Sequence, residues 1–102
     1  MNNQKVKLDK GKIQVGLFPI EAIKWGSKAM EYGVEKYYRG SFAEVETERY
    51  INAALRHLYA CQRDKGWDFS TIDEESGLPS IVQSMLNLAF IVTLSDRQGD
   101  FK

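Results

Sequence analysis

Two stretches decide the fold of this chain, Ala53-Ala54-Leu55-Arg56-His57-Leu58 and Glu75-Ser76-Gly77-Leu78-Pro79. The first sets an Arg-His step on an otherwise apolar helix. The second is an acidic turn that ends in a proline suited to open another helix. Arg56 and His57 lie beside leucines, so they start close to a seam between helices, where polar groups cost free energy unless they find partners. The sequence therefore predicts a polar site between helices.

The composition indicates a single domain spanning residues 1–102. A hydrophobic content of 43% with 12% aromatic residues is typical of globular chains and argues against disorder. Fourteen basic and fourteen acidic residues cancel, so no overall field favours DNA, RNA or a membrane surface. No apolar run approaches the roughly 20 residues of a membrane span, and no secretion signal follows Met1. With one cysteine, Cys61, an internal disulfide is excluded, and we expect a cytoplasmic protein.

The hydrophobic periodicity predicts a mostly α-helical fold of about three main helices. Residues 1–17 alternate apolar and polar side chains, which predicts an extended arm or short β-hairpin. The first helix opens at Pro19, and the second runs from about Thr47 to Asp64. Residues 64–78 read as a loop, Pro79 opens the third helix, and residues 96–102 form a polar tail.

The apolar positions of these helices lie on more than one face. The first helix carries two stripes, namely Ile20, Ile23, Met30, Val34 and Tyr37, and beside it Ala22, Trp25, Ala29 and Tyr32. The core candidates of the second are Ile51, Ala54, Leu55, Leu58 and Cys61, and those of the third are Ile81, Val82, Met85, Leu86, Leu88, Ala89, Phe90 and Val92. Gly26 and Gly33 suggest close approach of a backbone or a ligand. Because a small domain cannot bury two apolar faces of a helix alone, we expect a homo-oligomer.

Several polar side chains allow two interpretations. Glu31 and Glu35 lie four residues apart on one helical face, where they could share a divalent cation or pair with neighbouring lysines as a solvated surface. Asp73-Glu74-Glu75 could supply one metal ligand or complement the dipole of the following helix. The row Arg49, Arg56 and Arg63 could hold phosphates or form a solvated basic face.

Two uncharged candidates complete the set of polar side chains. His57 alone is more often a hydrogen-bonded interior histidine than a ligand. Asn87, placed between Leu86 and Leu88, needs a partner if it is buried.

Taken in order along residues 8–94, these blocks resemble a known family. They are Lys10-Gly11-Lys12, Pro19, Glu31 to Tyr37, Glu46 to Tyr50, Ala53 to Leu58, Asp73 to Pro79, and Asn87. The chain resembles the phage and bacterial dATP/dGTP diphosphohydrolase N-terminal domain family, a relative of the MazG-like all-α nucleotide pyrophosphohydrolases. The resemblance implies a helical fold, nucleotide ligands, a divalent metal in active members and oligomeric assembly.

The chain departs from the family pattern at two positions. Family members usually continue the Gly-Leu-Pro block with a histidine and carry a second histidine three residues later, where this chain has Ser80 and Gln83. Neither residue replaces an imidazole metal ligand. This pattern favours a protein that binds a purine or cyclic nucleotide without turnover and with no cofactor, like the phage sponge proteins that sequester nucleotide immune signals in the host cytoplasm. The alternative is an active diphosphohydrolase that uses Mg or Mn and releases the monophosphate from dATP or dGTP.

The resemblance and the residue types together predict the contacts of the ligand. We expect phosphate contacts from Lys36, Arg49 and Arg56. The base would stack on Tyr37 or Trp67 and accept or donate hydrogen bonds at His57 or Asn87. The enzyme alternative would use Glu31, Glu35 and Glu75 as metal ligands.

Overall fold

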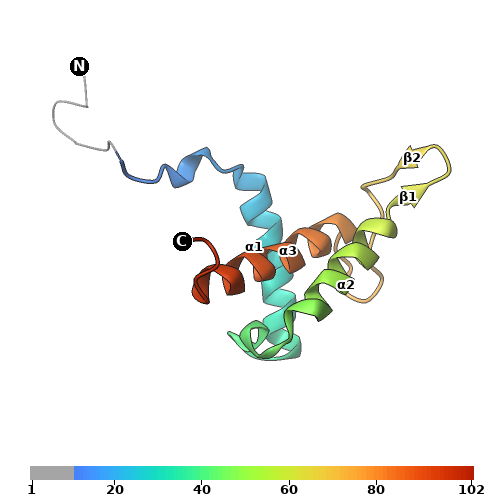
Figure 1. The fold of residues 1–102 in the computed structure, drawn as a ribbon. Helices are drawn as coiled ribbons and strands as arrows, with labels where there is room; N and C mark the ends of the chain where they lie inside the picture. Colours follow the sequence, from blue (N-terminus) through green and yellow to red (C-terminus); the bar gives the residue numbers. More distant parts are fainter. Residues whose placement is uncertain (1–10) are drawn as a thin grey trace, which may run out of the picture.

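The structure, a computed structural model, describes residues 11–102, and three α-helices dominate it (Figure 1). The helices are α1 (Ile20–Lys36), α2 (Thr47–Tyr59) and α3 (Ser80–Arg97). Two 3-10 turns, η2 (Val15–Leu17) and η3 (Ser41–Glu44), and two short strands, β1 (Gln62–Arg63) and β2 (Gly66–Trp67), complete the order. The predicted mostly helical fold with three main helices is confirmed. In the part of the chain described, no helix is long and apolar enough to cross a membrane.

Prolines set the starts of α1 and α3 as predicted. Pro19 and Pro79 occupy the N-cap positions with φ of −58° and −56° and extended ψ, so each turns the chain from an extended segment into a helix. Helix α3 continues to Arg97, slightly into the segment predicted as a tail.

The last five residues of the predicted second helix, 60–64, are not helical. Helix α2 ends at Tyr59, and β1 and β2 form an antiparallel hairpin with Gln62 opposite Trp67 and Arg63 opposite Gly66. Gly66 has a φ of +136°, a conformation that glycine adopts without steric cost, and this permits the tight reversal. Two-residue strands are too short to show a period-two pattern, so the hairpin left no hydrophobic signal in the sequence.

The predicted N-terminal hairpin lies partly outside the described residues. Residues 11–17 form no strand. Instead, the amide of Leu17 donates to the carbonyl of Gln14 over 3.0 Å and closes η2. This segment projects away from the three helices (Figure 1). We call residues 11–20 the arm.

Helices α1 and α2 each pack against α3, and the buried core is small (Figure 1). Its apolar members are Ala29, Tyr50, Ala54, Cys61 and Val82. At the α2–α3 seam the buried hydroxyl of Ser84 donates to the carbonyl of Ala54 over 2.8 Å. A Cβ at Gly26 would lie 3.5 Å from the terminal methyl of Met85, an ordinary contact with a side chain, and a Cβ at Gly33 would meet nothing within 4 Å, so neither glycine shows the predicted close approach within the described residues.

Several predicted core positions are exposed. On α1 the stripe that contains Ala29 packs inward, whereas most of the other stripe faces outward. The exposed members of the predicted core are Ile20, Ile23, Val34, Tyr37, Ile51, Leu55, Leu88, Ala89 and Val92. Helix α3 covers only one face of each of the other helices, so their second apolar faces have no cover within the described chain.

Candidate functional site

A cleft of about 700 Å³ opens between α1, η3, α2 and the middle of α3. The second half of α1 and the segment around η3 form one wall, and α2 from Arg49 to Arg56 forms the other. Helix α3 contributes the floor through Gln83, Leu86, Asn87 and Phe90. Its volume lies in the range typical of small-molecule sites, about 300–1,000 Å³.

The cleft brings together five of the seven side chains predicted to contact a nucleotide. These are Lys36, Tyr37, Arg49, Arg56 and Asn87. Three of them are cations, and Glu44 is the one acidic residue among those that line the cleft. Because Arg49 and Arg56 are seven residues apart on α2, they project from the same side of the helix, as the sequence predicted. The walls of the cleft therefore favour an anion.

Aromatic side chains gather at the end of the cleft near η3. Phe42 stacks on Phe90 with ring centroids 4.8 Å apart, and Tyr50 tilts against Phe90 at 5.0 Å. The hydroxyl of Tyr50 donates to the carbonyl of Phe42 over 2.5 Å. This cluster fixes the connection between α1 and α2. The exposed rings of Tyr37 and Tyr38 lie at the cleft beside it.

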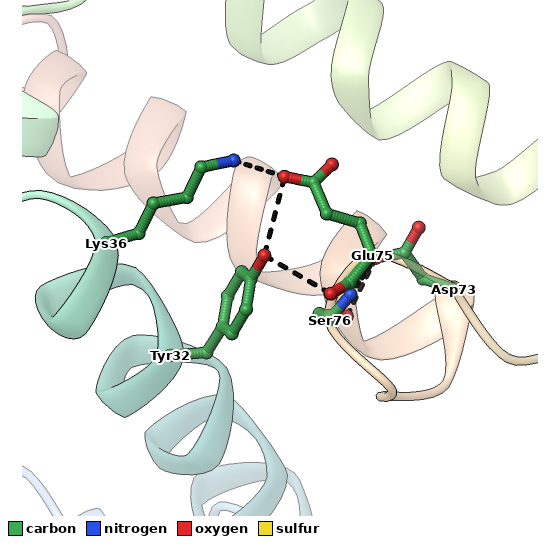
Figure 2. Close-up of polar contacts among 5 residues, drawn as sticks. All are labelled: Tyr32, Lys36, Asp73, Glu75 and Ser76. Atoms are coloured by element: carbon green, nitrogen blue, oxygen red, sulfur yellow. Dashed lines mark hydrogen bonds and ion pairs between the residues drawn. The ribbon is translucent and has the colours of Figure 1, made fainter.

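Figure 2 shows a polar cluster at the edge of the cleft, where α1 meets the loop before α3. Lys36 forms an ion pair with Oε1 of Glu75. The hydroxyl of Tyr32 lies 3.4 Å from the same oxygen and 3.4 Å from the carbonyl oxygen of Glu75. The hydrogen bond between Lys36 and Glu75 raises the pKa of the lysine and lowers the pKa of the carboxyl. Burial and the charge of Glu75 raise the pKa of Tyr32.

The loop that carries Glu75 is held by its own hydrogen bonds. The carboxylate of Asp73 accepts from the amide of Ser76 over 3.1 Å and from its hydroxyl over 2.7 Å. The amide of Asp73 donates to the carbonyl of Leu78, and the amide of Gly77 donates back to Asp73, each over 2.8 Å. Burial opposes ionisation of Asp73, but the bonds from Ser76 outweigh it and lower the pKa. The loop is therefore a defined turn that presents Glu75 to α1.

The other two residues predicted at the nucleotide, His57 and Trp67, do not line the cleft. Trp67 lies on β2, beyond the C-terminal end of α2, and stacks on Phe69 at 6.2 Å. Arg49 lies in the first turn of α2, so most of the length of this 13-residue helix, roughly 20 Å, separates the two ends. His57 is half-buried, and burial lowers its pKa, as expected of an interior histidine.

Two further predictions about polar residues have a structural outcome. Arg63, the third member of the arginine row, is on β1, where it donates to the carbonyls of Ala60 and Gln62 and to the hydroxyl of Thr71. It therefore holds the hairpin instead of extending the cationic wall. The amide nitrogen of Asn87 donates to the carbonyl of Gln83 over 2.7 Å, which satisfies that group inside α3.

Sequence reasoning missed several residues at the cleft. Asn52 and Gln83 add amide groups to the lining, and Tyr32 links it to the loop. The period of α2 could have identified Asn52, since it lies three residues after Arg49 and thus on the same face. Tyr32 was assigned only to a core stripe, because periodicity alone does not separate a core tyrosine from one at the edge of a site.

The carboxylates proposed for a metal do not form a site. Glu31 and Glu35 line a separate shallow hollow with Lys28 and Arg39, whereas Glu75 is paired with Lys36. Within residues 11–102 no three or more His, Cys, Asp or Glu side chains form a group that could hold a metal ion. A divalent cation needs several oxygen ligands together, and within residues 11–102 the three predicted carboxylates are not gathered in one place.

Comparison with known proteins assigns the scaffold. No curated protein and no solved structure matches the chain. Residues 2–102 match the family described as dATP/dGTP diphosphohydrolase, N-terminal, which is the family suggested by the sequence blocks. The match covers nearly the whole chain, and the protein therefore belongs to the dATP/dGTP diphosphohydrolase N-terminal family.

Proposed function

We propose that the protein binds a purine or cyclic nucleotide in the cleft and retains it without cleaving it. The observation that supports this proposal is the convergence of Lys36, Arg49 and Arg56 on one cleft that also offers aromatic and amide side chains. Guanidinium groups match phosphate oxygens through paired hydrogen bonds, and lysine adds a point charge. A nucleotide needs an anionic subsite and a flat apolar subsite close together, and this cleft offers both.

Some residues of the cleft would contact the phosphate of the nucleotide and others its base. Arg49 and Arg56 on α2 and Lys36 on α1 line the same cleft, and we expect a phosphate to bind between the two helices. Tyr37 offers an exposed ring for stacking a base. The amides of Asn87, Asn52 and Gln83 offer hydrogen bonds to base edges. His57 and Trp67 have no part in this proposal.

Retention is favoured over hydrolysis by the side chains near α3. Ser80, at one of the two positions where the family usually has a histidine, is 2% exposed at the start of α3. Gln83, at the other, faces the cleft with an amide. Glu75 and Asp73, two carboxylates of the loop before α3, already accept hydrogen bonds from Lys36 and Ser76. For a phage-encoded protein, retention would serve as an anti-defence sponge that removes a nucleotide immune signal.

The family description supports one alternative, a diphosphohydrolase that acts on dATP or dGTP. One experiment separates the two. The purified protein is incubated with a panel of linear and cyclic nucleotides and Mg or Mn, separated from free ligand and heat-denatured, and the released nucleotide is identified by chromatography. Intact nucleotide supports retention, whereas release of the monophosphate establishes the enzyme. The Arg49→Ala/Arg56→Ala variant should retain no nucleotide, and Arg63→Ala should behave like the wild type.

We also propose that the protein is a homo-oligomer in which the arm covers a second copy of this chain. Ile13, Leu17 and Ile20 are 89%, 79% and 68% exposed. Among the described residues, an apolar stripe on α2, Ile51, Leu55 and Tyr59, and another on α3, Leu88 and Val92, are 43–59% exposed. Uncovered apolar surfaces of this extent are unusual on a monomer. Pairing of identical chains covers both kinds of surface at once, and a net charge of zero sets up no repulsion between copies.

A further inference from the structure

We infer that Glu75 competes with the bound anion for Lys36 and thereby weakens, in the free protein, the cationic wall of the cleft. This inference rests on the proposed nucleotide site and adds a regulatory residue to it. Lys36 lines the cleft, yet its ammonium group contacts the carboxylate of Glu75 at the edge (Figure 2). Glu75 itself does not line the cleft.

The position of Glu75 is set by the fold of its loop. The turn closed by Asp73 and Ser76 fixes the backbone on one side, and the hydroxyl of Tyr32 reaches the carbonyl of Glu75 from α1. The side chain of Glu75 is 64% exposed and that of Lys36 is 42% exposed, so either can turn toward solvent. The backbone of Glu75 is therefore held beside α1, which keeps its carboxylate within reach of Lys36, but neither charged group is locked in the ion pair.

The Lys36–Glu75 ion pair reduces the positive charge that the cleft offers to an anion. A phosphate that enters between Arg49 and Arg56 meets two cations on α2, but the third charge is neutralised as long as Lys36 pairs with Glu75. A ligand that uses Lys36 must displace the carboxylate, whereas a ligand held by the two arginines alone has nothing to displace. An exposed ion pair is weak, so Glu75 lowers the affinity by a small factor and does not block binding.

The test is a double-mutant cycle on Lys36 and Glu75, measured by calorimetry with inorganic pyrophosphate and with dATP at constant ionic strength. Glu75→Gln should tighten binding about two- to five-fold, the range of a solvent-exposed ion pair. Lys36→Met should weaken binding, and in that background Glu75→Gln should have no effect. Glu74→Gln is the matched control, since it removes the same charge one residue away and no ion pair links Glu74 to Lys36 in the part of the chain described.

The outcomes separate this inference from the proposed function. Competition is supported if Glu75→Gln binds the probe more tightly than the wild type and Glu74→Gln does not. The same holds if the wild type binds too weakly to measure and Glu75→Gln binds measurably. If the wild type binds and Glu75→Gln binds equally or more weakly, the inference is overturned while the nucleotide site stands. Weaker binding would mean that Glu75 orients Lys36 for the ligand. If neither protein binds any probe, both proposals fail. Circular dichroism of each variant shows that the helices are intact.

Discussion

If the protein is the proposed oligomer, replacing the apolar side chains of the arm should dissociate it. The variant is Leu17→Ser/Phe18→Ser/Ile20→Ser, at positions that are 79%, 58% and 68% exposed in the isolated chain. Full burial of such a side chain contributes about 1.5–3 kcal/mol. Scaled by the exposed fractions, the three together correspond to about two fully exposed side chains. Covering them would contribute roughly 3–6 kcal/mol per arm, which corresponds to about a hundred-fold to ten-thousand-fold in the association constant.

The assay is sedimentation or light scattering between 1 and 100 µM, chosen so that about a hundred-fold weaker association becomes visible. The wild type should give a multiple of the 11.7 kDa chain mass, and the variant should shift toward the single-chain mass. Phe101→Ser is the control, because it removes an exposed aromatic ring, 61% exposed, from the opposite end of the chain. A wild-type mass of 11.7 kDa at all concentrations would refute self-association. An oligomeric wild type with an unchanged variant would refute the role of the arm.

Three further predictions follow from the helices and the cleft. Arg56→Ala should weaken nucleotide binding, measured by calorimetry, about ten- to a hundred-fold, the range of a charge-assisted contact. Arg63→Ala is the control and should bind with the wild-type affinity. Equal losses of affinity in both variants would refute binding in the cleft. Ser84→Ala deletes the buried bond to the carbonyl of Ala54 and should lower the free energy of unfolding in urea by about 0.5–1.5 kcal/mol; no change would mean that this bond is replaced in the variant. Burial lowers the pKa of His57 below its ordinary 6.5, so the unfolded chain binds the proton more readily than the folded one. The free energy of unfolding should therefore fall as the pH drops through and below 6.5. In His57→Gln this decrease in stability should be absent. A second loss at more acidic pH comes from Asp73, whose pKa is lowered, and it should persist in His57→Gln.

The starts of the helices could be predicted from the sequence, but their ends and exposed faces could not. Pro19 and Pro79 mark the starts of α1 and α3 because a proline fixes φ and gives up a donor that the first turn does not need. The end of α2 depends on Gly66 and on the pairing of only two residues per strand, and such short strands have no period. Burial was overestimated for Ile51, Leu55 and Val92, since periodicity shows which positions share a helical face and not which of these faces another helix covers.

The helical period predicts which residues of the cleft share a face of one helix, but not which residues of different elements come together. Arg49 and Arg56 share a helical face, so their common direction follows from the sequence alone. That Lys36 lines the same cleft depends on how α1 packs against α3, which no local pattern contains. Trp67 was proposed as a stacking ring because it is aromatic and lies in a loop, but the hairpin carries it to the far end of α2.

The topology explains why an open cleft exists at all. Helices α1 and α2 both pack against α3, and the short connection around η3 joins them at one end (Figure 1). Two helices that share a third helix as their main support need not fill the space between their own side chains. Lys36 at the end of α1 and Arg49 near the start of α2 lie close to that connection, so a space lined by cations forms without burying any charge in the core. Burial of unpaired charges would cost several kcal/mol, and an open cleft avoids this cost. The arrangement therefore keeps the cations hydrated, and in the proposed complex the Lys36–Glu75 pair would decide how much of their charge an anion meets.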